Sequence, residues 1–155
     1  MHIDPRQKVE ILIALLERRY TAIDGIRERV YALSIWTMGV FLGAASLVVQ
    51  GDLALSWPRR AFLAMAVIVA LGVILYYVRD LERGFRTQFR AAVRIERLLG
   101  LYEPGAFDPD APLYPSEWAR AGTEFAGGRF FRNTYLLLGL GAALLIAAIG
   151  TSGVI

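Results

Sequence analysis

Three long segments without charged residues alternate with strongly charged segments along the chain. The uncharged segments are residues 30–51, 61–78 and 133–155, which contain 22, 18 and 23 residues. A helix needs about 20 apolar residues, within an accepted range of about 17 to 25, to cross a hydrocarbon core about 30 Å thick. Three such segments in 155 residues leave too little polar sequence to cover them in water. The pattern therefore predicts an all-α integral membrane protein with three transmembrane helices, at residues 30–51, 61–78 and 132–154.

The first two spans are expected to continue as helices beyond the membrane. Residues 5–29 predict a cytoplasmic helix that leads into the first span, with Asp4 as a suitable N-cap and Pro5 in the first turn. No helix-stop signal follows the second span until Gly100, so residues 79–101 predict a cytoplasmic arm.

Two polar connections complete a single membrane domain over residues 1–155. Residues 52–60 form a short external loop that ends in Ser56 and Pro58, a suitable start for the second helix. Residues 102–129 predict a proline-rich loop followed by a short interfacial helix, capped by Ser116, before the third span.

The distribution of basic residues predicts the orientation. The first 29 residues carry six basic side chains and residues 79–133 carry nine, whereas the loop at 52–60 carries two. Because basic residues collect on the cytoplasmic side, the N-terminus and the long middle segment are expected inside and the C-terminus outside. No cleavable signal peptide is expected, since the first residues lack an apolar stretch. Sixteen arginines against one lysine suggest a GC-rich bacterial genome, and hence the bacterial inner membrane.

Six arginines follow the second span at helical spacing and fall within an arc of about 80° on a helical wheel. These residues, which we call the arginine stripe, are Arg79, Arg83, Arg86, Arg90, Arg94 and Arg97. The opposite face of the same helix is apolar and consists of Leu81, Phe85, Ala92, Ile95 and Leu99. The arm is therefore amphipathic, with one side suited to packing and the other to presenting guanidinium groups.

The N-terminal helix carries an acidic counterpart, the acidic stripe, within an arc of about 40°. Its members are Glu10, Glu17, Asp24 and Glu28, and the opposite apolar face consists of Leu12, Leu16, Ile23, Ile26 and Val30. The two arms follow adjacent spans, so they should run antiparallel and pack through their apolar faces. The stripes would then lie on opposite flanks and pair with those of neighbouring copies, a head-to-tail contact that can close into a ring. The ten stripe residues are therefore candidate contacts of a homo-oligomer. A solvated face and attraction to anionic lipid headgroups remain alternatives for the arginines.

Small residues four apart in each span predict close helix packing in lipid. These candidate packing residues are Gly39, Gly43, Ala66, Ala70, Gly139, Ala143 and Ala147.

The sequence offers little for catalysis or metal binding. The chain has no cysteine and one histidine, His2, at a chain terminus, and it has no nucleotide-binding or hydrolase motif. No enzyme activity, cofactor, metal or nucleic-acid partner is expected. The acids around Asp108 and Asp110 lack the spacing of a calcium loop. Apart from tyrosine, the three uncharged segments contain no ionisable residue, which argues against ion pumping. A passive pore would have Ser34, Thr37 and Ser46 as its few polar groups on the first span.

The arrangement of helix, span, short loop, span and long helix resembles the SLATT-type membrane proteins of bacteria. The resemblance covers residues 8–102 and lies in "ERRYTAIDGIRERVYALSIW" and "RGFRTQFRAAVRIERLLGLY". It implies a pore-forming effector of nucleotide-activated antiphage defence. The expected function is thus an oligomeric membrane effector or channel-like protein assembled through its arms. The alternatives are a non-conducting scaffold or accessory subunit that docks a cytoplasmic protein partner, and a module that binds anionic membrane lipids.

Overall fold

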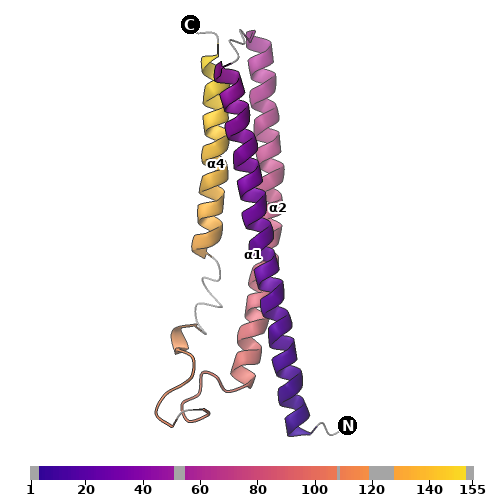
Figure 1. Cartoon of the computed structure of the whole chain (residues 1–155), viewed down its shortest axis with the longest axis vertical. Coiled ribbons are helices and arrows are strands. Elements are labelled where there is room, and N and C mark those ends of the chain that lie inside the picture. The colour runs from indigo at the N-terminus through magenta and orange to yellow at the C-terminus, as the bar shows by residue number, and fades with distance from the viewer. Residues whose placement is uncertain (1–3, 51–54, 108, 119–127, 153–155) are drawn as a thin grey trace. The chain divides into compact units, whose positions relative to one another are not determined.

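A computed structural model describes residues 4–50, 55–107, 109–118 and 128–152. These residues form three long helices and no strand: α1 (Pro5–Gln50), α2 (Trp57–Leu98) and α4 (Gly128–Thr151) (Figure 1). The prediction of an all-α protein is confirmed for this part of the chain. All three helices are long and apolar enough to cross a membrane.

The predicted start signals lie where α1 and α2 begin. The carbonyl of Asp4 accepts the first helical hydrogen bond of α1, from the Lys8 amide at 3.0 Å, as an N-cap residue does. Likewise, the Ser56 carbonyl accepts from the Arg60 amide at 3.1 Å, directly before α2. Helix α1 continues without interruption from a charged segment into an apolar one, and α2 continues from an apolar segment into a charged one. One turn of the predicted interfacial helix is present at residues 116–118, and the rest of it lies outside the described residues.

The chain divides into two compact units, to both of which α1 and α2 contribute. The arm unit comprises Met1–Glu28 and Leu81–Gly128. The three-helix unit comprises Arg29–Asp80 and Arg129–Ile155.

The core of the three-helix unit lies mainly between α1 and α4. Phe41 of α1 packs with three buried residues of α4, and this cluster is extended by partly buried residues of α1 and α2. The α4 residues are Ala142, Leu145 and Ile149, and the partly buried ones are Ala44, Ala45, Val48, Val67 and Leu71. Glycine at position 141 permits the closest approach, because a Cβ atom there would clash with the Met38 sulfur and lie 3.2 Å from Cδ2 of Phe41. The α1–α4 contact therefore depends on a residue without a side chain.

The candidate packing residues lie elsewhere on these helices. Gly39, Gly43 and Gly139 have no neighbour within 4 Å of an added Cβ atom. The four candidate alanines, Ala66, Ala70, Ala143 and Ala147, are exposed. Within one chain the close helix contact is thus made at Gly141, which the small-residue pattern did not single out. Packing of the seven residues against a second copy stays a prediction.

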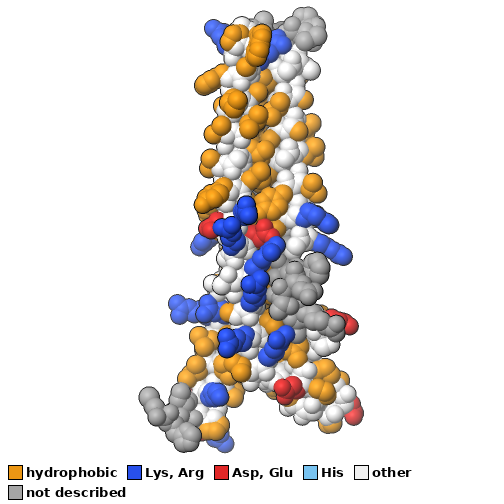
Figure 2. Space-filling model, turned by 180° about the vertical axis from the view of Figure 1, so that it is seen from behind, with side chains coloured by type: hydrophobic (Ala, Val, Ile, Leu, Met, Phe, Trp, Pro, Cys, Tyr) orange, Lys and Arg blue, Asp and Glu red, His pale blue; other side chains and the backbone are white. Residues whose placement is uncertain are grey.

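The outer surface of the three-helix unit is largely apolar. Its exposed side chains include Trp36, Val40, Leu47, Phe62 and Leu136. Figure 2 shows hydrophobic side chains covering this unit, with Lys and Arg side chains at its ends. A surface of this kind matches lipid rather than water, since large apolar patches are rare on soluble proteins.

Candidate functional site

The arm unit is held together by the two predicted apolar faces. Ile23 of α1 and Phe85 and Ala92 of α2 are buried, and the other members of both faces within this unit are partly buried. An added Cβ atom at Gly84 would lie 3.8 Å from Cδ1 of Ile26, so the two helices approach closely there. The helical periodicity of the sequence therefore identified the packed side of each arm correctly.

Polar contacts border this apolar seam. The Arg19 guanidinium donates to Oε1 of Gln88 at 2.7 Å, and the Arg27 guanidinium lies 5.8 Å from the centre of the Phe85 ring. The second contact has the geometry of a cation–π interaction. These contacts join α1 to α2 along the arm unit.

All six arginines of the arginine stripe and all four carboxylates of the acidic stripe are exposed. Arg86 of the arginine stripe forms an ion pair with Glu82, one turn earlier in α2, at 2.5 Å. The packing of the arms therefore leaves both stripes on the surface.

The C-terminal end of α2 is a Schellman motif. The Gly100 amide donates to the Arg97 carbonyl at 3.1 Å, and the Leu101 amide donates to the Glu96 carbonyl at 3.2 Å. Gly100 has φ of 75°, a left-handed conformation that glycine adopts without strain. The motif reverses the chain, so that Tyr102 returns toward the last turns of α2.

This reversal completes a polar cluster around the buried Glu96, which we call the tyrosine clamp. The Tyr20 hydroxyl of α1 donates to Oε1 of Glu96, and the Tyr102 hydroxyl donates to Oε2. Only 4% of Glu96 is exposed. Both carboxylate oxygens are thus hydrogen-bonded, which compensates for the removal of this group from water. One side chain links α1, α2 and the loop that follows.

The same arrangement raises the pKa of both tyrosines far above the ordinary value of 10.0. Burial is the main cause, because it disfavours the phenolate. The hydrogen bond to Glu96 and the electrostatic repulsion between phenolate and carboxylate act in the same direction.

The chain after the clamp folds back with aromatic contacts. The Tyr114 amide donates to the Leu101 carbonyl at 2.9 Å, and the Tyr114 ring lies 5.9 Å from that of Tyr102 and 5.4 Å from that of Trp118. The first half of the predicted loop is therefore anchored to the end of α2.

The tyrosine clamp was not predicted, although the position of Glu96 on its helix is a signal for it. On the helical wheel Glu96 lies about 100° from Arg79, on the side away from Arg94, and about 20° from Phe85 of the apolar face. It therefore lies beside the apolar face rather than in the arginine stripe. A carboxylate at such a position needs hydrogen-bond donors, and its donors come from residues 76 and 6 positions away in the sequence.

The carboxylates of the described residues do not gather into a metal site. No group of three or more His, Asp or Glu side chains could hold a metal ion within the described part of the chain. Asp110 is exposed, whereas Asp108 and His2 lie outside the described residues. Of the polar groups expected to line a passive pore, Ser34 and Thr37 are buried and Ser46 is exposed. The Ser34 hydroxyl donates to the Val30 carbonyl at 2.7 Å, and the Ser46 hydroxyl accepts from the Gln50 amide at 3.0 Å.

Comparisons of the chain with protein-family models, with curated proteins and with solved structures find no match.

Proposed function

We propose that the protein is a bacterial inner-membrane protein that acts as a homo-oligomeric, channel-like effector assembled through its arms. In this proposal the three helices cross the membrane, the arm unit lies in the cytoplasm and the C-terminus lies outside. The observation that carries the proposal is that both charged stripes are exposed although the apolar faces of the arm unit are already packed.

Charge complementarity favours a second copy as the partner. The acidic stripe belongs to α1 and the arginine stripe to α2, so a subunit presents both signs on different helices. An acidic stripe that meets the arginine stripe of the next subunit forms a head-to-tail contact, which closes into a ring at a suitable rotation. Arginine suits this role because its planar guanidinium binds carboxylates through two hydrogen bonds. The exposed small residues of the three helices would allow close packing of neighbouring subunits in lipid.

The experiment is a charge swap followed by mass determination in detergent at low salt. Arg90→Glu with Arg94→Glu should weaken assembly by about thirtyfold, because each reversal removes an attraction and adds a repulsion, about 1 kcal/mol a pair. Adding Glu10→Arg and Glu17→Arg to that variant should restore assembly. Arg18→Glu, on α1 outside the acidic stripe, is the control and should leave assembly unchanged. A wild-type protein that remains monomeric at low salt would refute the proposal.

A non-conducting scaffold is the second candidate. It is favoured by two buried hydroxyls of the three-helix unit, since those of Ser34 and Thr134 donate to carbonyls of their own helices. Conductance of the reconstituted oligomer separates the two. An assembled protein that carries no current would support the scaffold. It would also argue against the pore-forming function that the resemblance to SLATT-type proteins implies.

A further inference from the structure

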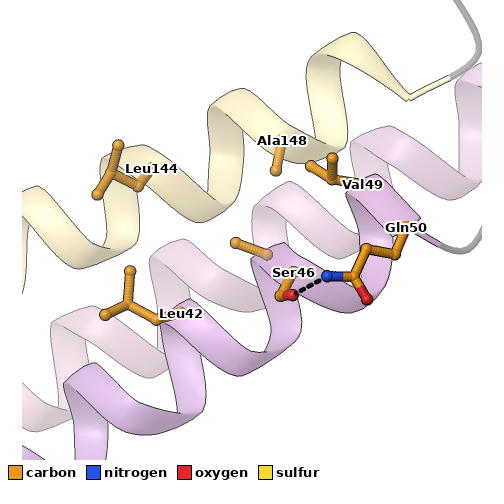
Figure 3. A pocket seen from close by; sticks show the side chains of 7 residues that line it. Leu42, Ser46, Val49, Gln50, Leu144 and Ala148 are labelled. Atoms are coloured by element: carbon orange, nitrogen blue, oxygen red, sulfur yellow. Dashed lines mark hydrogen bonds between the residues drawn. The ribbon is translucent and has the colours of Figure 1, made fainter.

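Two surface grooves lie between α1 and α4, one toward each end of the three-helix unit. The first groove, of about 270 Å³, is lined by Tyr31, Ser34, Ile35, Phe130, Asn133, Thr134 and Leu137. The second groove, of about 330 Å³, is lined by Leu42, Ala45, Ser46, Val49, Gln50, Leu144 and Ala148 (Figure 3). Both grooves are mainly apolar, and both are formed by the same two helices. Because α1 and α4 run parallel, residues 31 and 130 lie toward one end of the three-helix unit, and residues 50 and 148 lie toward the other.

The two ends differ in charge. Within the three-helix unit, four exposed arginines and one exposed acid, Asp80, lie at the end that holds the first groove. These arginines are Arg29, Arg79, Arg129 and Arg132. At the other end the Arg60 guanidinium donates to the carbonyls of Leu55 at 2.8 Å and Gly150 at 3.2 Å, and Arg59 is exposed. The end with the first groove is therefore the more basic one.

The first groove also presents a graded series of groups along α4. Arg129, Asn133 and Leu137 are spaced four residues apart, so they follow one another on the same side of the helix. Going from the end of the unit inward, the series runs from a cation to an amide to an apolar side chain. A phospholipid presents the matching order of phosphate, ester and acyl chain.

Two exposed polar side chains of the groove can donate hydrogen bonds to a ligand. The Ser34 and Thr134 hydroxyls donate to the carbonyls of Val30, at 2.7 Å, and Phe130, at 3.1 Å, within their own helices. The exposed Tyr31 hydroxyl and the exposed Asn133 amide can donate to a ligand. Donors beside a guanidinium group favour an anionic oxygen ligand.

We propose that the first groove is a binding site for an anionic phospholipid. The headgroup phosphate binds at Arg129, the ester region binds at Asn133 and Tyr31, and one acyl chain lies along Ile35 and Leu137. The second groove accepts acyl chains without selecting the headgroup. This inference rests on the proposed membrane insertion, but it does not require that the protein conduct or form a ring.

The test compares lipids that differ only in the headgroup. Delipidated full-length protein in detergent is titrated with phosphatidylglycerol or phosphatidylcholine of identical chains, and bound lipid is counted by native mass spectrometry. Phosphatidylglycerol should bind at least about fivefold more tightly, the gain expected from one guanidinium near an anionic headgroup. Arg129→Gln should remove that preference, and Leu137→Trp should fill the groove and abolish selective binding.

Matched variants at the other end serve as controls. Arg59→Gln and Leu144→Trp should leave the headgroup preference unchanged, and circular dichroism verifies that each variant remains helical. Glycerol 3-phosphate, which lacks acyl chains, should not compete at equal concentration. Equal binding of both lipids, an unchanged preference in Arg129→Gln, or competition by glycerol 3-phosphate would each overturn the proposed lipid site.

Insertion is measured separately by resistance of the wild-type protein to alkaline carbonate extraction. Loss of the protein from the membrane fraction would refute both the proposed function and the lipid site. Retention without headgroup preference would refute the lipid site alone.

Discussion

At the scale of single residues, Glu96 is the one charged side chain that is buried among the described residues. It is an almost fully buried carboxylate whose two oxygens accept hydrogen bonds from tyrosines of α1 and of the loop after α2. Removal of one donor leaves a buried carboxylate oxygen without its partner, and this costs more than the loss of an ordinary surface hydrogen bond. The tyrosine clamp should therefore determine the local stability of the arm unit.

Tyr20→Phe and Tyr102→Phe should each destabilise the arm unit by about 1.5–3 kcal/mol, the usual contribution of a hydrogen bond to a charged group. Hydrogen exchange measured by mass spectrometry should show faster exchange of the amides in the last turns of α2. Tyr76→Phe is the control, because Tyr76 is 75% exposed and belongs to the three-helix unit. Equal exchange rates in all three variants would show that the clamp does not stabilise the arm unit.

The raised pKa values of Tyr20 and Tyr102 also predict a pH dependence. In the unfolded chain a tyrosine loses its proton near pH 10.0, whereas in the folded arm unit both tyrosines keep theirs to higher pH. Above about pH 10 the unfolded state therefore binds fewer protons, and the stability that these two groups contribute falls as the pH rises. Absorbance at 295 nm should show late-titrating phenols, one of which disappears in each Tyr→Phe variant. Titration of both groups near pH 10 in the folded protein would contradict this account.

At the scale of helices, periodicity and end signals predicted much of the structure. Asp4, Ser56 and Gly100 lie at or next to the observed helix ends, because capping depends on residues close in sequence. Helix α4 begins at Gly128, before the predicted span at residue 132, because hydropathy indicates only the apolar part of a helix. The pairing of α1 with α4 through Gly141 was not predictable, since a hydrophobic helix carries no polar face that distinguishes its neighbours.

This pairing gives a test at the same scale. Gly141→Leu should destabilise the three-helix unit by about 1–3 kcal/mol, because a side chain there overpacks the space occupied by Met38 and Phe41. Thermal unfolding in detergent, followed by circular dichroism, measures the effect. Gly139→Leu is the matched control, since an added Cβ atom there meets nothing within 4 Å. A larger loss of stability in the Gly139 variant would contradict the described α1–α4 contact.

At the scale of the whole molecule, charge and apolar surface are divided between the two units. The three-helix unit has an exposed apolar surface, and the arm unit carries the acidic stripe and all of the arginine stripe except Arg79. Net charge alone, +3, conceals this division, but the order of charged and uncharged segments reveals it. The sequence therefore predicted which parts would be apolar, whereas the tyrosine clamp and the grooves required the three-dimensional structure.

The most direct test of the account is the sidedness of the chain in the membrane. Because the protein has no cysteine, single cysteines can be introduced without a background signal. Glu17→Cys and Arg90→Cys represent the two arms, and Arg59→Cys represents the opposite end of α2. An impermeant maleimide should label the first two only in inverted membrane vesicles and Arg59→Cys only in right-side-out vesicles. Labelling of Arg59→Cys on the same side as Arg90→Cys, or of the two arms on different sides, would contradict a protein that crosses the membrane with both arms in the cytoplasm.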